Sequence, residues 1–293
     1  MTRQHRFTRP HHPRSLAVAL VALGLLGPGA LNADTLVVAN KAEATVSLIG
    51  LDNGKVMATL ESGAGPHEVA ISPDGKLALV TNYGGRDARG SSLTLIDITA
   101  ARVIRTIDLG EYHMPHGVEW VDQRHAAVTA EANQALVVVD TEAGEVIRSI
   151  PTGQDVTHMV ALNPSGTRAF TANIGSGTIT ALDLENGTFE RNIATGDGAE
   201  GIAVTATGQH IWVTNRAADT ITVLDATNLE PVREISSKGF PIRATATPLG
   251  QVLVTRARAG DMVIYDATSM EEVGKVSFDL ERMEAGDRLV GDR

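Results

Sequence analysis

Four side chains able to bind a metal recur at one position of a repeating sequence pattern. In four successive repeats, His67, His116, His158 and Glu200 each stand fifteen residues before the expected end of a β-strand. Three imidazoles and one carboxylate are a suitable ligand set for Zn, Cu, Fe or Ni. If equivalent positions of neighbouring repeats converge in space, the pattern predicts a divalent transition metal at these residues. Neutral imidazoles bind metal, so we expect affinity to fall as the pH drops through about 6.5.

The same spacing also has a purely structural interpretation. His67 shares strand parity with Val69 and Ile71, and side chains of that parity are expected to face the core between repeats. A histidine there would need only a hydrogen-bond partner. The sixth repeat has Ile242 at this position, and no short His-x-x-x-His or Cys-x-x-Cys pattern supports a metal. The sequence leaves both interpretations open.

The elements that must position these residues are short strands. Within residues 65–85, two runs rich in aliphatic and β-branched residues, 68–72 and 77–81, predict a pair of strands. Pro73-Asp74-Gly75 supplies the turn between them, since proline presets φ and glycine tolerates positive φ. The pattern returns near residues 158–173 and 200–215, so the chain is an array of one supersecondary unit.

Two sets of markers give the array a period of about 42 residues. The residues expected to close the second strand of each repeat are Asn40, Asn82, Glu131, Asn173, Asn215 and Arg256. The residues expected to close the third strand are Asp97, Asp140, Asp183, Asp225 and Asp266. Four strands at this period predict an all-β propeller with four-stranded blades. Six repeats are visible, and the first lacks its first strand, so the propeller is either six-bladed or a seven-bladed one truncated at its C-terminus.

Three segments carry a resemblance to a known family. Val80-Thr81-Asn82-Tyr83, Thr171-Ala172-Asn173 and Val213-Thr214-Asn215 resemble the YVTN-repeat β-propellers over residues 35–278. The resemblance implies the propeller fold, commonly with seven blades, and says little about function. We expect the motif asparagines to cap the turns that follow them.

The stretch from Gly65 to Gly85 also has some likeness to the seven-bladed lactonase family, which includes 6-phosphogluconolactonase. That likeness implies a hydrolase that uses polar residues at the channel mouth. His67, Glu131, Arg216 and Arg256 are the candidates for such a role. No other catalytic motif is recognisable.

The first strand of each repeat should line the central channel, so its first residues and the neighbouring loops should gather at one mouth. The candidate binding residues at that mouth are His67, Glu68, His113, His116, Glu131, His158, Glu200, Arg216 and Arg256. The long loop from Tyr83 to Ser91 should overhang them. The candidate metal ligands are His67, His116, His158 and Glu200.

Residues 1–33 differ from the rest of the chain. Four arginines precede an apolar run and a small-residue boundary at Ala33, which is typical of a cleavable signal peptide, leaving residues 34–293 as the propeller domain. The run is too short for a comfortable membrane span, so we expect no transmembrane anchor after cleavage and a periplasmic or secreted protein. Without the four arginines, 21 basic residues remain against 35 acidic ones, a net charge of −14. Such a surface argues against nucleic acid as a partner.

These observations favour an exported, non-enzymatic propeller. It would bind an unidentified protein or small molecule at its channel mouth, with a divalent transition metal as the candidate cofactor. A lactonase-type hydrolase is the alternative.

Overall fold

The computed structural model describes residues 34–278, and the predicted signal peptide lies outside this part. The described residues form 23 strands in six antiparallel sheets, numbered here as blades I to VI. Blade I contains β1 (Thr35–Asn40), β2 (Thr45–Gly50) and β3 (Val56–Glu61). Blade II contains β4 (Pro66–Ile71), β5 (Leu77–Gly84), β6 (Arg89–Asp97) and β7 (Arg102–Asp108). Blade III contains β8 (Pro115–Trp120), β9 (His125–Ala130), β10 (Ala135–Asp140) and β11 (Glu145–Pro151). Blade IV contains β12 (Thr157–Leu162), β13 (Arg168–Asn173), β14 (Thr178–Asp183) and β15 (Thr188–Ala194). Blade V contains β16 (Ala199–Val204), β17 (His210–Asn215), β18 (Thr220–Asp225) and β19 (Pro231–Ser236). Blade VI contains β20 (Pro241–Ala246), β21 (Gln251–Arg256), β22 (Asp261–Asp266) and β23 (Glu272–Ser277).

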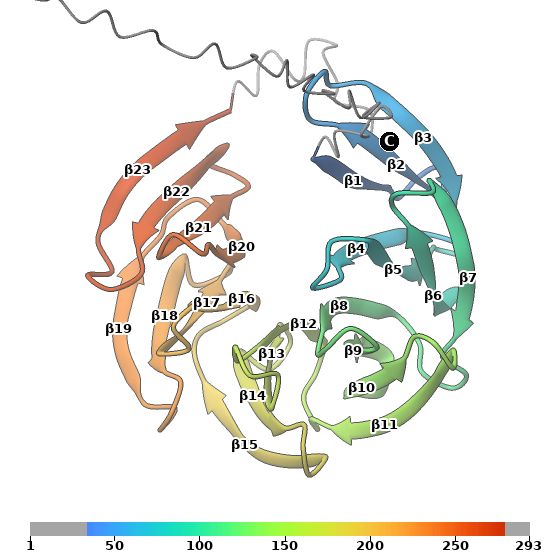
Figure 1. The fold of residues 1–293 in the computed structure, drawn as a ribbon. Helices are drawn as coiled ribbons and strands as arrows, with labels where there is room; N and C mark the ends of the chain where they lie inside the picture. The colour runs from blue at the N-terminus through green and yellow to red at the C-terminus, as the bar shows by residue number, and fades with distance from the viewer. Residues whose placement is uncertain (1–33, 279–293) are drawn as a thin grey trace, which may run out of the picture. The chain divides into compact units, whose positions relative to one another are not determined.

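The predicted propeller is confirmed, including the first repeat without its innermost strand. Each sheet is a meander in chain order, and the blades follow one another around a central axis with β4, β8, β12, β16 and β20 innermost (Figure 1). Neighbouring innermost strands lie side by side from β4 to β20, and β1 lies beside β4. Within residues 34–278 no comparable contact joins blade VI to blade I, and Figure 1 shows these two blades apart.

The turn between β4 and β5 forms as the sequence predicts. The Asp74 carboxylate accepts hydrogen bonds from the Ser72 hydroxyl, at 2.8 Å, and from the Lys76 backbone N–H, at 3.1 Å. Gly75 has a φ of +73°, a left-handed conformation that costs glycine little.

Apolar side chains between neighbouring blades make the core. Leu79 and Leu93 of blade II, for example, pack against Val128 and Val137 of blade III, and all four are fully buried. The propeller has no disulfide, because the chain has no cysteine. These interfaces between sheets therefore hold it together.

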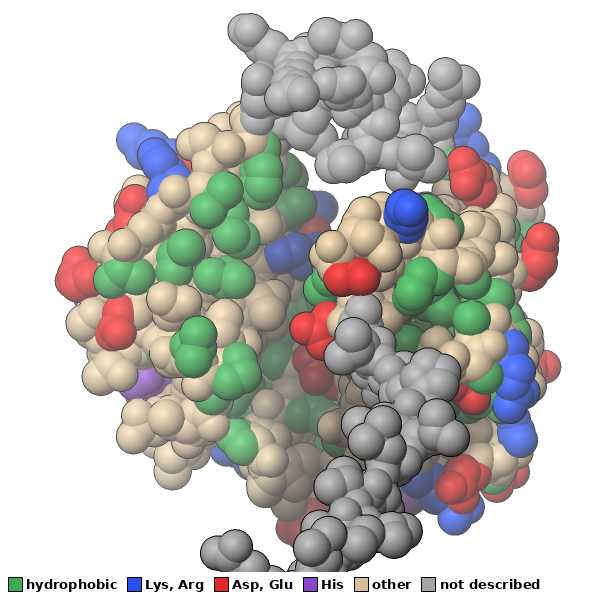
Figure 2. Space-filling view, turned by 45° about the horizontal axis from the view of Figure 1, so that its top comes forward, with side chains coloured by type: hydrophobic (Ala, Val, Ile, Leu, Met, Phe, Trp, Pro, Cys, Tyr) green, Lys and Arg blue, Asp and Glu red, His purple; other side chains and the backbone are tan. Residues whose placement is uncertain are grey.

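The outward faces of the first and last blades are less covered. Met262 and Ile264 on β22 are half-buried, whereas their repeat equivalents Ile221 and Val223 on β18 are fully buried against blade VI. On blade I, Leu36 of β1 is 47% exposed. Figure 2 shows hydrophobic side chains at the surface in both halves of the view.

The motif asparagines bond across their sheets instead of capping their own turns. The Asn173 amide donates to the hydroxyls of Thr178, at 3.1 Å, and Thr180, at 2.9 Å, both on the next strand. Asn40, Asn82 and Asn215 make the same kind of bonds to serine or threonine hydroxyls of the next strand. The predicted turn cap was wrong, but the asparagines have a structural role.

The third repeat needs a correction of one residue. Ala130 pairs with Ala135 as Asn173 pairs with Thr178, so Ala130 occupies the asparagine position of blade III. Glu131 comes one residue later and begins the 3-10 helix η1 (Glu131–Asn133). Within residues 34–278, no helix is long and apolar enough to cross a bilayer.

Candidate functional site

The second residue of each innermost strand lies at a β-bulge. In blade II, Pro66 pairs with Asn82, but the next pair is Val69 with Val80, so β4 carries one extra residue there. The same shift occurs in the other four-stranded blades, beside His116, His158, Glu200 and Ile242. A bulge re-aims side chains and breaks the two-residue alternation of a strand. The parity argument that would turn these histidines toward the inter-blade core therefore does not hold here.

A threonine of the next strand stabilises three of these bulges. Thr81 accepts a hydrogen bond from the Glu68 backbone N–H at 3.0 Å, and Thr129 accepts one from Gly117 at 2.8 Å. Thr214 does the same for Gly201 at 2.8 Å. The bulge removes these N–H groups from the strand ladder, and the hydroxyl supplies the missing acceptor.

The bulges bring three imidazoles of successive blades together in one stack. The ring centroids of His67 and His116 are 4.1 Å apart, and those of His116 and His158 are 3.6 Å apart. Tyr83 stands edge-on to His67 and His116, with centroid distances of 5.3 and 5.5 Å. His116, at the centre, is 1% exposed, and its Nδ1 has no hydrogen-bond partner in the described structure.

Two carboxylates enclose the inner end of the stack. Glu131 binds His158 Nδ1 through one oxygen and accepts a hydrogen bond of 2.6 Å from the Tyr83 hydroxyl through the other. Glu200 lies 3.7 Å from His158 Nε2. Both nitrogens of His158 therefore face buried carboxylates.

Arginines complete the mouth. Arg216 donates to Glu200 at 2.6 Å. Arg243 donates to Glu200 at 3.0 Å and to Glu68 at 2.7 Å. Because Arg243 belongs to blade VI and Glu68 to blade II, this residue connects the polar groups of the two blades that flank blade I.

Sequence reasoning missed Arg243 and Tyr83. Arg243 follows Ile242, the residue assigned to the repeated position. Strict alternation along the strand would have pointed the Arg243 side chain away from the cluster. Tyr83 is the repeat equivalent of Glu131 and Arg216, since each follows the asparagine position of its blade. With the third repeat aligned correctly, that shared position would have identified Tyr83.

Two predicted mouth residues have other partners. Arg256 forms a pair of hydrogen bonds with Asp261 on the adjacent strand, at 2.7 and 2.6 Å. The backbone N–H of His113 donates to Asn133 at 2.8 Å, and its ring takes no part in the stack of imidazoles. The structure brings together His67, Glu68, His116, Glu131, His158, Glu200 and Arg216.

The histidines differ in protonation. Burial lowers the pKa of His116, and the neighbouring His158 and His67 lower it further. Burial likewise lowers the pKa of His67, with Lys41 adding to the effect. Burial also acts to lower the pKa of His158, but the hydrogen bonds and charges of Glu131 and Glu200 outweigh it and raise that pKa.

Two groups of these residues could each hold a metal ion. Ligand atoms of His67, Glu68 and His116 all lie within 4.8 Å of one another, and so do those of His116, Glu131 and His158. Both groups share His116. The predicted fourth ligand, Glu200, belongs to neither group and is paired with two arginines.

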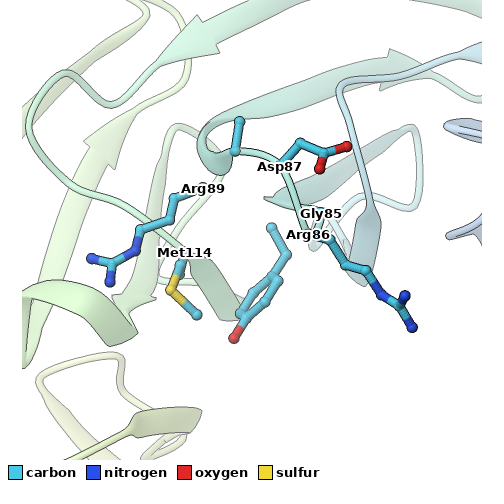
Figure 3. A pocket seen from close by; sticks show the side chains of 7 residues that line it. Gly85, Arg86, Asp87, Arg89 and Met114 are labelled. Carbon is cyan, nitrogen blue, oxygen red and sulfur yellow. The ribbon is translucent and has the colours of Figure 1, made fainter.

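A cavity of about 450 Å³ lies beside this cluster, under the loop after β5. Tyr83, Arg86, Asp87, Arg89 and Met114 are among its lining residues (Figure 3). The predicted loop from Tyr83 to Ser91 is shorter than expected, because β5 extends to Gly84 and β6 begins at Arg89, and residues 85–88 between them line this concave surface.

Comparisons with known proteins agree with the fold. Residues 121–282 match the family described as the cytochrome D1 heme domain, and residues 22–127 match the YNCE-like β-propeller family. The second match is consistent with the YVTN resemblance. The chain is also similar to the hydrazine synthase of Kuenenia stuttgartiensis, at 19% identity, with a TM-score of 0.68 over 83% of each chain. At that identity the likeness shows the fold alone. No curated protein matches the chain significantly.

Proposed function

We propose that this chain, which belongs to the cytochrome D1 heme domain family, binds a metal ion at its channel mouth and is an exported propeller that acts as a binding protein. The observation that carries the proposal is His116. Its imidazole is buried between two others, burial lowers its pKa, and its Nδ1 lacks a partner. A buried polar atom without a partner is costly, and a neutral imidazole is the form that coordinates metals.

The family description names a heme, but these residues do not fit a macrocycle. An axial imidazole needs a free nitrogen that faces a space wide enough for a flat ring system. His158 has both nitrogens engaged with carboxylates, and His116 has His67 on one side and His158 on the other. His67 has the rings of both His116 and Tyr83 close to it, at centroid distances of 4.1 and 5.3 Å. A single metal ion fits this donor set better.

Electrostatics also favours an ion over a heme. The mouth arginines Arg216 and Arg243 already bind the carboxylates Glu200 and Glu68. The acidic side chains of a tetrapyrrole would have to displace these partners. Each displacement would leave a partly buried carboxylate unpaired, which is strongly unfavourable.

The export part of the proposal rests on the arginine-rich start, the apolar run and the Ala33 boundary of residues 1–33. Hydrolysis of the lactonase type is less well supported. Of its four candidate residues, Arg256 is held by Asp261 on the neighbouring strand.

Metal content and metal titration test the proposal. Protein purified without chelating resin should contain about one equivalent of a transition metal. Calorimetric titration with Zn²⁺ or Cu²⁺ should show binding that the triple change His67→Ala, His116→Ala, His158→Ala abolishes. His210→Ala, outside the stack, is the matched control. Hemin should give no saturable shift of its absorption spectrum.

Two results would contradict the proposal. A silent titration combined with a destabilised triple variant would show that the imidazoles serve packing alone. Stoichiometric hemin binding would show that the mouth opens to a macrocycle.

A further inference from the structure

The two groups of ligands at the mouth are not equally free to bind an ion. In the inner group, both oxygens of Glu131 and both nitrogens of His158 face partners within the cluster. A metal there would have to break these interactions. Glu131 is 8% exposed and His158 9%, so the displaced groups would have little access to water.

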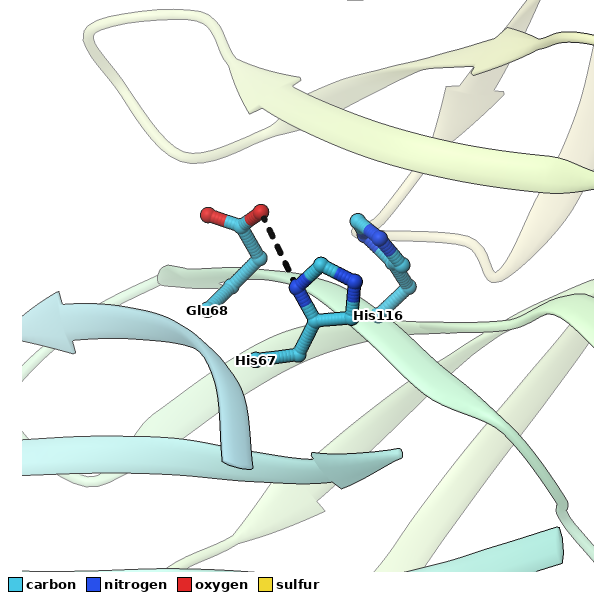
Figure 4. Close-up of side chains that lie close together, drawn as sticks. All are labelled: His67, Glu68 and His116. Carbon is cyan, nitrogen blue, oxygen red and sulfur yellow. Dashed lines mark ion pairs between the residues drawn. The ribbon is translucent and has the colours of Figure 1, made fainter. Parts of the chain in front are cut away.

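In the outer group, His67, Glu68 and His116, Arg243 holds one oxygen of Glu68 at 2.7 Å, and His116 Nδ1 has no hydrogen-bond partner in the described structure. His67 and Glu68 are half-buried, so an ion can reach them from solvent. His67 Nδ1 lies 3.7 Å from a carboxylate oxygen of Glu68. Figure 4 shows the carboxylate of Glu68 and the ring of His67 close together, with the ring of His116 alongside.

We propose that His67, Glu68 and His116 form a divalent metal site with two histidines, one carboxylate and open coordination positions. The inference rests on the proposed function and names its ligands. His158 and Glu200 share the repeated position with His67 and His116, but their partners hold them outside the coordination sphere.

Three protein ligands with open positions are the arrangement of metal sites that bind a substrate or small ligand, whereas structural sites are closed by four. Two histidines and one carboxylate suit Fe²⁺ in particular, and Zn²⁺ also accepts this set. The site therefore has room for a small exogenous ligand, such as water or a small anion, on the metal.

Arg243 has a positioning role in this site. It donates to Glu68 at 2.7 Å from blade VI, and such outer partners orient a metal-binding carboxylate. Loss of such a partner lowers metal affinity about 10–100-fold. Metal binding at Glu68 would thus be linked to the contact between blades VI and II.

Matched substitutions in the two groups test the assignment. Co²⁺ is the probe, because its visible absorption reports its ligands. We expect His67→Gln and Glu68→Gln each to weaken Co²⁺ binding more than about 100-fold, as loss of a direct ligand should exceed loss of an outer partner. His158→Gln and Glu131→Gln make the same chemical changes in the inner group and should leave affinity within about threefold. The loss of Co²⁺ affinity in Arg243→Ala should lie between the losses in these two pairs of variants.

Circular dichroism and urea unfolding would show that each variant is folded. His67 and Glu68 are half-buried, so their variants should fold even if the inner-group variants do not. Azide added to the Co²⁺-loaded protein should change its absorption, since azide can occupy an open position.

The outcomes separate the assignment from the function on which it rests. Absence of Co²⁺, Zn²⁺ and Cu²⁺ binding in the wild type would overturn the proposed function, and the assignment with it. Binding that survives Glu68→Gln but is lost in Glu131→Gln would overturn the assignment alone. An azide-insensitive spectrum would show a closed site and overturn the open positions.

Discussion

Within residues 34–278, the outward face of blade VI is less buried than the equivalent face of blade V, so equivalent substitutions in the two blades should be unequal in cost. Ile221 in blade V and Met262 in blade VI occupy the same position of the third strand. Ile221 is fully buried between two blades, whereas Met262 is half-buried. Truncation of a fully buried Ile or Met to Ala costs about 2–5 kcal/mol. We expect that cost for Ile221→Ala.

Met262→Ala should cost less, about 2 kcal/mol at the low end of that range, because part of the side chain is already in contact with water. The assay is urea unfolding followed by circular dichroism at low protein concentration, with equal m-values as the check that the unfolded states are comparable. Equal costs for the two variants would refute the reasoning, because they would mean that another surface covers blade VI in solution. Light scattering would then show whether that surface belongs to a second copy or to blade I.

Three further predictions concern the gap between blades VI and I within residues 34–278, the histidines and the N-terminal segment. Adding a seventh repeat after residue 278 should raise the melting temperature and reduce self-association seen by light scattering, because unpaired sheet edges promote association; unchanged values would favour six closed blades. The folded pKa of His158 is raised above 6.5, so its contribution to stability is full below pH 6.5 and lost as the pH rises through the folded value; thermal melts should show this decline in the wild type and not in His158→Gln. Intact-mass measurement should find a mature chain that begins near Asp34, and a retained full chain of 30.8 kDa would contradict the signal peptide.

Burial also changes the pH dependence predicted for metal binding. From the sequence alone, affinity should fall near the ordinary histidine pKa of about 6.5. The pKa values of His67 and His116 are both lowered, so these imidazoles stay neutral to lower pH. Calorimetric titration should therefore show that the midpoint of the decline in Zn²⁺ affinity lies below pH 6.5. A midpoint at about 6.5 would mean that the histidines are not buried as described.

The sequence predicted the architecture because two separate sets of residues, those that close the second strands and those that close the third, show the same repeat. Alternating strands, the Pro-Asp-Gly turn and the period of about 42 residues all depend on local chemistry. The missing innermost strand of the first repeat was also predictable, since Thr35 to Asn40 already matches the second strand of later repeats. These features need no knowledge of which blades touch.

The site was harder to predict, because its members come from five blades. The repeated position correctly brought together His67, His116 and His158, but the partners of Glu200 depend on contacts between strands far apart in sequence. Arg243 reaches Glu68 across 175 residues, and no local pattern predicts such a pair. Arg256 differs from Arg243 because its partner lies within its own blade. Its partner Asp261 stands opposite it on the adjacent strand, so both charged groups are paired within one sheet.

The bulges explain how the side chain at one position of the repeat can vary while the backbone around it keeps its conformation. Thr81 and Thr214 hold the bulge through its backbone N–H, and Asn82 and Asn215 tie the second strand to the third. Neither task uses the side chain at the bulge itself. The side chain at that position is therefore not needed to maintain the bulge. It is histidine in blades II, III and IV, glutamate in blade V and isoleucine in blade VI. The Thr–Asn pair that makes the repeat recognisable thus maintains the bulge and the sheet, and the side chains at the bulge include the metal ligands that we propose.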